Sequence, residues 1–259
     1  MNVELLNKEL VKEALLNYVV HFEEMDSTNK YAKENNLPPD GIVITSHQKD
    51  GKGRFGRKWL TAHDEDLTFS LVKKFKISVD NIHLVNFYTS YILSETLKHF
   101  LSSHNNIHVH LKWPNDVLLN KKKICGILLD VSGLNEAEKN FIIGIGLNVN
   151  KSEIPEDIAH KATSLANETN TIHNIEELLI SFLQNFYANL HLIELRNELM
   201  TLWKKNSELV GKKVKFLVVA DSSEVEAKIA DIEEDGSLKV VLSDGDIKNF
   251  YSGEITFVY

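Results

Sequence analysis

Apolar residues recur at near-helical spacing in several stretches of the chain. The spacing predicts helices over residues 1–20, 84–100 and 175–202, and Ser27 is suited to cap a shorter helix that runs to about residue 36. Shorter apolar runs predict strands over 42–45, 67–72, 109–113, 124–131 and 141–148. The last two runs are nearly continuous, which is typical of strands buried on both faces. The polar, glycine-rich residues 49–60 between the first two strands are predicted to form a loop.

The pattern changes near residue 209. Short β-branched runs at 214–219, 225–232, 238–242 and 255–258 are separated by turn clusters at 221–223, 234–236 and 244–245. Short strands at this spacing predict a small β-barrel. We therefore predict a boundary near residues 207–211, with one domain over 1–208 and a second over 209–259.

Composition excludes several classes of protein. With 43% hydrophobic and 25% charged residues the chain has ordinary globular usage, and its net charge of −8 argues against a basic nucleic-acid coat. Apolar runs are too short to span a bilayer, and charges interrupt those of the N-terminus, which does not resemble a secretion signal. Cys125 is the only cysteine, which excludes an intrachain disulfide. We expect a cytoplasmic protein without a membrane partner.

The most informative segment is the basic, glycine-rich loop. Residues 49–58 hold five basic side chains and one acid. Glycines let a backbone approach a ligand, and interleaved arginine and lysine hold phosphate oxygens, so the loop predicts a phosphate or phosphate-ester ligand. Gly51, Gly53 and Gly56 match the G-x-G-x-x-G pattern of dinucleotide-binding proteins. However, the residues that follow lack helical spacing, and Lys76 stands where that pattern needs an acidic residue. A solvated basic loop is the alternative.

Polar residues also gather where the strand over 109–113 ends. Pro114 stops the ladder, so Asn115 and Asp116 fall in a turn, and a carboxylate there is a suitable Mg²⁺ ligand. Lys123 directly precedes the predicted buried strand over 124–131. Its ammonium group is therefore expected to lie within a binding site rather than in bulk water. Ordinary turn chemistry is the alternative for Asn115 and Asp116, and a solvated hairpin tip explains the lysines at 121 and 122.

Two further segments carry weaker signals. Gly144 and Gly146 interrupt an apolar strand, which indicates close approach of a ligand or of another backbone, or else a bulge. The segment 26–29 is predicted first of all to cap a helix. A cap does not exclude contact between a ligand and the remaining hydroxyl or amide groups of the segment. His108 and His110 alternate on a strand, but no third ligand has a recognisable metal spacing.

Together these motifs resemble the biotin–protein ligases. The resemblance rests on the order Ser27-Thr28-Asn29, then Gln48 with Gly51–Trp59, then Lys112–Asp116 with Lys123 and Gly126, then Gly144–Asn148. It implies an α+β fold, with a mixed sheet and packed helices followed by a small SH3-like barrel. The similarity is to the short bacterial class, because residues 1–20 are too few for a DNA-binding winged helix.

The resemblance also implies the chemistry. Biotin and ATP, with Mg²⁺, form biotinyl-5′-AMP, and biotin then passes to one lysine of a biotin carboxyl carrier protein domain. By resemblance the catalytic residues are Arg54, Lys123 and Asp116, and Asp116 is the candidate Mg²⁺ ligand. The implied biotin-binding residues are Ser27, Thr28, Asn29, Gln48, Lys52, Gly53, Arg54, Lys123, Gly126, Gly144 and Gly146. The implied nucleotide-binding residues are Gly51, Lys52, Arg54, Arg57, Trp59, Lys112, Asn115 and Asn148.

Lys52 departs from the family pattern, which more often has arginine there. Lysine keeps the positive charge of arginine but cannot donate two parallel hydrogen bonds to one phosphate. Three other functions stay open at this stage. They are a lipoate- or octanoate-handling relative, a non-catalytic regulator that binds biotinyl-adenylate and DNA, and a barrel that binds peptides. The absence of a DNA-binding segment and the net charge argue against the regulator. A monomer and a homodimer are equally compatible with the sequence.

Overall fold

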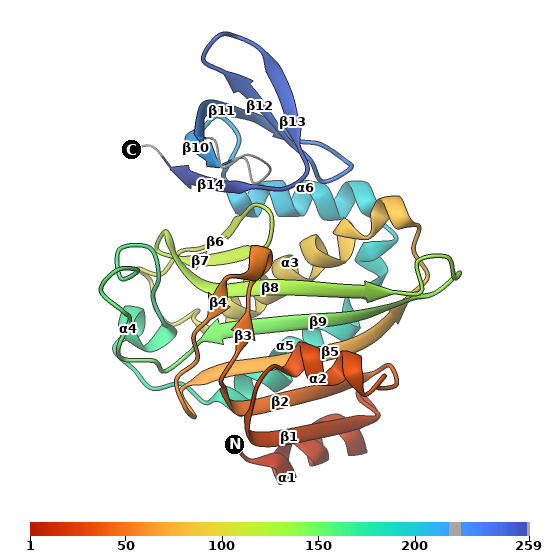
Figure 1. Ribbon diagram of the computed structural model, residues 1–259. Coiled ribbons are helices and arrows are strands. Elements are labelled where there is room, and N and C mark those ends of the chain that lie inside the picture. Colours follow the sequence, from red (N-terminus) through yellow and green to blue (C-terminus); the bar gives the residue numbers. More distant parts are fainter. Residues whose placement is uncertain (218–223, 258–259) are drawn as a thin grey trace.

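The computed structural model describes residues 1–217 and 224–257 (Figure 1). Its main body is a seven-stranded sheet in the order β1-β2-β5-β9-β8-β7-β6. β1 and β2 run parallel and the other neighbours run antiparallel. The strands are β1 (Tyr18–Met25), β2 (Gly41–Gln48), β5 (Asp66–Phe75), β6 (Val109–Lys112), β7 (Asp116–Leu119), β8 (Lys122–Ser132) and β9 (Lys139–Asn148).

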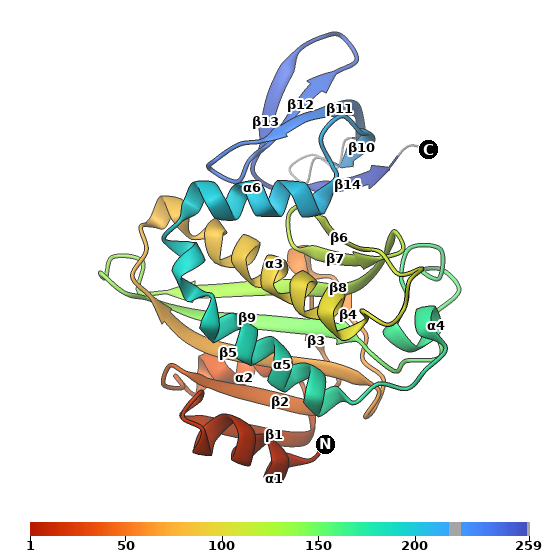
Figure 2. The same cartoon turned by 180° about the vertical axis from the view of Figure 1, so that it is seen from behind.

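The helices cover the two faces of this sheet unequally. α3 and α5 lie across one face, as Figure 2 shows, whereas α2 and the β3–β4 hairpin lie on the other, in front of the sheet in Figure 1. The helices are α1 (Val3–Leu6), α2 (Thr28–Glu34), α3 (His83–Phe100), α4 (Leu165–Thr169), α5 (Ile175–Ala188) and α6 (Arg196–Ser207). The hairpin pairs β3 (Gly51–Lys52) with β4 (Lys58–Trp59).

This asymmetry corrects the prediction that the runs at 124–131 and 141–148 are buried on both faces. Ile127, Ile143 and Ile145 are buried against the helices. Alternate residues such as Gly126 and Leu128 are only half-buried, because they face a cleft on the side of α2. The runs are apolar on both faces because one face packs on helices and the other forms the floor of that cleft.

Two predicted helices are broken in the structure. The helical spacing of residues 1–20 holds for α1 and for a π-helical turn at Asn7–Lys12, but β1 begins at Tyr18. Ala14, with φ of 57°, reverses the chain before it. The predicted helix over 175–202 divides into α5, a 3-10 turn at Leu190–Ile193 and α6. After this break α6 packs on α3, where Trp203 contacts Phe87 and donates to Ser90 Oγ at 2.9 Å.

Several elements were missed because they are short. β7, β13 and α4 each span four or five residues, too few to establish a period. The predicted loop over 49–60 also contains the β3–β4 hairpin and a 3-10 turn at Arg54–Gly56. In this turn Phe55 has φ of 59°, which is strained for a bulky side chain.

The C-terminal region forms a separate five-stranded antiparallel sheet in the order β13-β12-β11-β10-β14. Its strands are β10 (Lys213–Leu217), β11 (Glu224–Ile232), β12 (Leu238–Leu242), β13 (Ile247–Phe250) and β14 (Glu254–Phe257). The α+β fold with a small all-β SH3-like unit is therefore confirmed. The predicted turn at 221–223 and the predicted strand ends at 218–219 and 258 lie outside the described residues.

α6 lies between the two sheets (Figures 1 and 2). A direct hydrogen bond also joins them, because Trp113 Nε1 donates to Gly236 O at 2.9 Å. The β11–β12 turn that holds Gly236 therefore rests against the segment that follows β6. Of the helices in the described part of the chain, none is long and apolar enough to cross a membrane.

Candidate active site

A cleft of about 1070 Å³ lies on the α2 side of the main sheet. Its floor is formed by β8 and β9, and its walls come from the start of α2, the end of β2, the β3–β4 hairpin and the β6–β7 turn. Residues 154–162 and part of the C-terminal sheet complete the rim. Segments far apart in the sequence thus converge on one cavity.

One end of the cleft is formed by uncharged polar side chains. This neutral end consists of Ser27, Thr28, Asn29 and Gln48, all of them buried. Ser27 caps α2 by accepting from Lys30 N at 3.4 Å, as the sequence predicts. Gln48 Oε1 accepts from Thr28 N at 3.0 Å. Because these side chains bond to one another, the neutral end is organised before any ligand arrives.

A second group of residues in the cleft is strongly basic. This group, the basic end, consists of Arg54, Arg57, Lys112, Lys123 and Lys161 around Asp116. Lys123 Nζ lies 2.6 Å from Asp116 Oδ1. The remaining positive charge exceeds what one carboxylate neutralises, so an anion bound there relieves repulsion between the cations.

Burial perturbs two of the cations in the basic end. It lowers the pKa of Arg54, while Asp116 opposes this effect and Arg57 adds to it. It lowers the pKa of Lys112 more than Asp116 raises it, and the neighbouring cations lower it further. Among the described residues, the Lys112 ammonium makes no hydrogen bond or ion pair with a side chain or carbonyl. Groups perturbed in this way are typical of functional sites.

Asn115 fixes the position of Arg54. Its Oδ1 accepts from Arg54 Nη1 at 3.2 Å, and its Nδ2 donates to Ile127 O at 2.7 Å. The Arg54 guanidinium also lies 4.7 Å from the centre of the Phe55 ring. The basic loop and the segment after β6, which are 61 residues apart in sequence, are therefore joined at the cleft.

Glycines allow side chains to lie directly on the floor. A Cβ at Gly144 would stand 2.3 Å from Asn29 Oδ1, and one at Gly146 would stand 2.3 Å from the Trp59 ring. At Gly126 the same atom would meet Lys123 Nζ and Trp59 at 3.2 Å. The interpretation of Gly144 and Gly146 as close-approach positions fits this geometry better than a bulge does, because β8 and β9 pair without a register shift there.

Comparison with known proteins gives a consistent result. The model of the Biotin/lipoate A/B protein ligase family matches residues 21–148, and that of the Biotin protein ligase C terminal domain matches residues 209–258. The chain is 30% identical to a single-residue mutant of the biotin protein ligase from Aquifex aeolicus, solved in complex with biotin. That match covers 93% of this chain and 97% of the other, with a TM-score of 0.77. The chain belongs to the biotin protein ligase family.

The chain is also similar to two further members of the family. The Bifunctional ligase/repressor BirA of Bacillus subtilis is 24% identical over 95% of this chain and 76% of its own length. The Biotin--[acetyl-CoA-carboxylase] ligase of Mycobacterium tuberculosis is 27% identical over 80% of this chain and 79% of its own length. The resemblance that the motifs suggested is thus confirmed at the level of the family.

The cleft of this biotin protein ligase brings together all but one of the residues that the resemblance assigned to the site. Gly51 is the exception, since it packs behind the cleft, where a Cβ would stand 2.4 Å from Gln48 Nε2. The predicted residues that line the cleft are Ser27, Thr28, Asn29, Gln48, Lys52, Gly53, Arg54, Arg57, Trp59, Lys112, Asn115, Asp116, Lys123, Gly126, Gly144, Gly146 and Asn148.

Asn148 and Trp59 differ in how they are held. Asn148 Nδ2 donates to Thr163 O at 2.9 Å, and its Oδ1 lies 3.4 Å from Lys151 Nζ. The Trp59 Nε1–H is buried and makes no hydrogen bond within the described part of the chain. Since a buried donor without a partner is costly, Trp59 is suited to rearrange when a ligand enters.

Sequence reasoning missed four contributors to the site. Ser70 and Asp130 hold Asn29 from behind, at 2.5 and 3.0 Å. Lys151 forms a buried pair with Asp66 at 2.8 Å, although burial still raises the pKa of Asp66. The segment 154–162 shows no period or motif, and it reaches the cleft because Lys123 N donates to Lys161 O at 2.8 Å.

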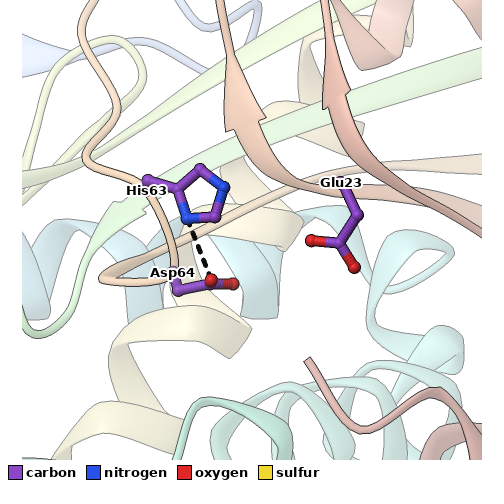
Figure 3. Close-up of side chains that lie close together, drawn as sticks. All are labelled: Glu23, His63 and Asp64. Carbon is purple, nitrogen blue, oxygen red and sulfur yellow. Dashed lines mark ion pairs between the residues drawn. The ribbon is translucent and has the colours of Figure 1, made fainter.

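The side chains of the cleft suit Mg²⁺ only when a substrate supplies some of its ligands. Asp116 is the carboxylate of the basic end and already faces Lys123. Among the described residues, the group that could hold a metal by its own side chains is Glu23, His63 and Asp64, which is exposed and outside the cleft (Figure 3). The cleft thus fits a cation that arrives with phosphate oxygens, because Mg²⁺ commonly binds through one or two carboxylates and its substrate's phosphates.

Proposed function

We propose that this ligase activates biotin with ATP to biotinyl-5′-AMP and then transfers biotin to a lysine of a biotin carboxyl carrier protein domain. The observation that carries the proposal is the division of one cleft into a neutral and a basic end over a shared glycine floor. A neutral, prearranged hydrogen-bonding pocket suits the cyclic urea of biotin, and an excess of cations suits the triphosphate of ATP. The related biotin protein ligase from Aquifex aeolicus, solved in complex with biotin and ATP, supports this choice.

In the first half-reaction, a carboxylate oxygen of biotin attacks the α-phosphorus of ATP, and the bond to pyrophosphate breaks. Two anionic groups must meet, so catalysis depends on positioning and on charge stabilisation. We assign Arg54 and Lys123 to this task, because both line the basic end, Arg54 from the turn between β3 and β4 and Lys123 from β8. Asp116 orients Lys123 through their 2.6 Å contact.

In the second half-reaction, the ε-amine of the acceptor lysine attacks the acyl carbon of biotinyl-5′-AMP. The bond from this carbon to phosphate breaks, AMP departs and the amine loses a proton. The relatives named biotin--[acetyl-CoA-carboxylase] ligase support a carboxylase carrier domain as the acceptor. We assign retention of the intermediate to the basic loop, with Lys52, Gly53 and Arg54 closing over it.

For the nucleotide we assign Lys52, Arg54, Arg57, Trp59, Lys112, Asn115 and Asn148, without Gly51, which does not line the cleft. Mg²⁺ would bind through Asp116 together with phosphate oxygens and would supply further positive charge where pyrophosphate leaves. For biotin we assign Ser27, Thr28, Asn29, Gln48, Lys52, Gly53, Arg54, Lys123, Gly126, Gly144 and Gly146.

We further propose that residues 1–208 form the catalytic domain and that residues 209–259 form a second domain that completes the cleft. Gly253, Ile255 and Thr256 line it from the C-terminal sheet. A cytoplasmic location and the absence of a DNA partner remain part of the proposal, supported by the single cysteine and the net charge of −8. The active form is a monomer or a homodimer.

The test is exchange of labelled pyrophosphate into ATP, with biotin, lipoate and octanoate supplied in parallel. Exchange that depends on biotin alone, followed by labelling of a carrier domain, supports the proposal. Exchange with lipoate or octanoate instead would move the chain to a related branch of the family. Binding of biotin without any exchange would favour a regulator, which a gel-shift assay at moderate salt then examines.

A further inference from the structure

The neutral end is backed by two polar side chains that do not line the cleft. Ser70 on β5 is fully buried, and Asp130 on β8 is half-buried. Both reach Asn29, which lies over Gly144 between them. The sheet register explains this arrangement, because Gly144 pairs with Ser70 on one side and with Leu128 on the other.

The chemistry of Asp130 fixes the orientation of the Asn29 amide. Asn29 Nδ2 lies 3.0 Å from Asp130 Oδ2 and 3.4 Å from Leu128 O. A carboxylate and a carbonyl only accept hydrogen bonds, so the NH₂ group must face them. Asn29 Oδ1 therefore faces Ser70, from which it is 2.5 Å distant.

This orientation in turn fixes the two hydroxyl protons. Ser70 Oγ contacts both Asn29 Oδ1, at 2.5 Å, and Thr28 Oγ1, at 2.7 Å. Serine has one proton to donate, and an amide oxygen has none, so the Ser70 proton goes to Asn29. The contact between Ser70 and Thr28 is then a hydrogen bond only if Thr28 donates.

Thr28 Oγ1 lies 2.7 Å from Ser70 Oγ and 3.4 Å from Gln48 Oε1, so with its proton directed at either of these acceptors it offers only lone pairs to the cleft. Gln48 Oε1 is engaged by Thr28 N at 3.0 Å, which leaves the Gln48 NH₂ group as a donor. The neutral end thus presents Thr28 Oγ1 to a ligand as an acceptor, while the Gln48 NH₂ group lies beside Gly51. A cyclic urea carries the complementary N–H, whereas a dithiolane ring or an alkyl chain carries none.

We propose that Ser70 and Asp130 are positioning residues that set the direction of the Thr28 hydroxyl and so select a ligand that offers an N–H group. This inference rests on the proposed function, since it names the part of the substrate that the relay recognises. The pair acts through Asn29 and Thr28 without touching the ligand. A site that hydrogen-bonds a substrate N–H discriminates strongly against analogues that lack it.

The first experiment measures the dissociation constants of biotin and ATP by calorimetry for wild type and Ser70→Ala. Without Ser70 the Thr28 hydroxyl loses its shorter contact and keeps only the 3.4 Å contact with Gln48 Oε1, so its proton can turn into the cleft. We therefore expect the biotin constant to rise about tenfold, the effect of one misdirected hydrogen bond. The ATP constant should stay within twofold. Ser94→Ala is the matched control, because Ser94 is equally buried but bonds to Tyr91 O in α3.

The second experiment separates the acceptor role of Asp130 from its charge. Asp130→Asn can still accept from Asn29 through its amide oxygen and should bind biotin within twofold of wild type. Asp130→Leu cannot accept and should bind about threefold more weakly, a smaller loss because Leu128 O still accepts from Asn29. Lys33→Gln, which removes the 3.5 Å ion pair with Asp130, should leave biotin binding unchanged.

An analogue that keeps the urea ring but lacks the thioether should be weakened by the same factor as biotin in Ser70→Ala. Equal biotin constants for wild type and Ser70→Ala would overturn the relay. So would losses in Asp130→Asn as large as those in Asp130→Leu. If wild type itself bound no biotin, the proposed function would fail instead, so the two failures are distinguishable.

Discussion

The two ends of the cleft are prepared for their ligands in different ways. In the neutral end nearly every donor is already paired, and the order of these bonds fixes what is presented to a ligand. In the basic end positive charge is in excess, and Lys112 forms no ion pair within the described residues. One end is organised without its ligand, while the other is electrostatically incomplete without an anion. Substitutions should therefore affect the two ends by different physical routes.

The largest effect is expected at Lys123. Lys123→Ala removes a cation from the reacting groups and leaves the Asp116 carboxylate unpaired. We expect the rate of biotin-dependent pyrophosphate exchange to fall by about a hundredfold or more. Lys74→Ala, an exposed lysine on β5, is the matched control. Exchange within fivefold of wild type would remove Lys123 from the active site.

A smaller loss, confined to biotin, is expected at the floor. In Gly144→Ala the new Cβ would stand 2.3 Å from Asn29 Oδ1, so Asn29 must move and the biotin dissociation constant should rise about tenfold. The ATP constant should change less than twofold. Gly126→Ala should be milder, because its new Cβ meets the mobile end of Lys123 at 3.2 Å. Titration calorimetry measures both, and a reversed order would contradict this account of the floor.

Arg54→Gly should affect a later step. Arg54 is held by Asn115 at 3.2 Å in the wall of the basic end, so its loss should weaken retention of the adenylate. We expect biotinyl-5′-AMP to dissociate several-fold faster, with a smaller change in biotin affinity. Release of radiolabelled intermediate from the enzyme measures this rate. An unchanged half-life of the complex would show that Arg54 does not retain the intermediate.

The smallest effect concerns pH. Burial lowers the pKa values of His83, His110 and His173 below the ordinary 6.5. As pH falls through 6.5 the unfolded chain therefore binds protons before the folded chain does, and the free energy of unfolding decreases. Between pH 7.5 and 5.5 the melting temperature should drop, and His83→Gln should reduce that drop by a few degrees at most. An equal drop in both proteins would count against a role for His83.

The parts of the site that the sequence revealed are those with local chemical signatures. A glycine-rich basic loop and a strand-ending proline restrict the backbone, so Arg54, Lys112 and Asp116 of the basic end carried local signals. Gln48 of the neutral end was assigned only through the family resemblance. Ser70 and Asp130 escaped because each lies in an ordinary apolar strand, and only the pairing of β5, β9 and β8 places them around Asn29.

Residues 154–162 escaped for a related reason, since their place in the cleft depends on a single bridge to Lys123. The secondary structure was likewise predicted only where the local sequence carries a signal. Long periodic segments such as α3 were predicted, whereas the break between α5 and α6 was not, because the apolar spacing continues through it. The start and direction of α6 depend on its packing between the two sheets. The local spacing of apolar residues does not encode this packing.

Gly236 limits which C-terminal domains of related ligases could replace the one in this chain. It has φ of 78°, its carbonyl accepts from Trp113, and a Cβ there would stand 2.7 Å from His83 and 2.9 Å from Phe87. A chimaeric ligase whose new domain lacks glycine at this turn would lift that domain off the Trp113 segment. The two domains therefore form a matched pair, and successful hybrids should be those that carry the turn and its docking surface together.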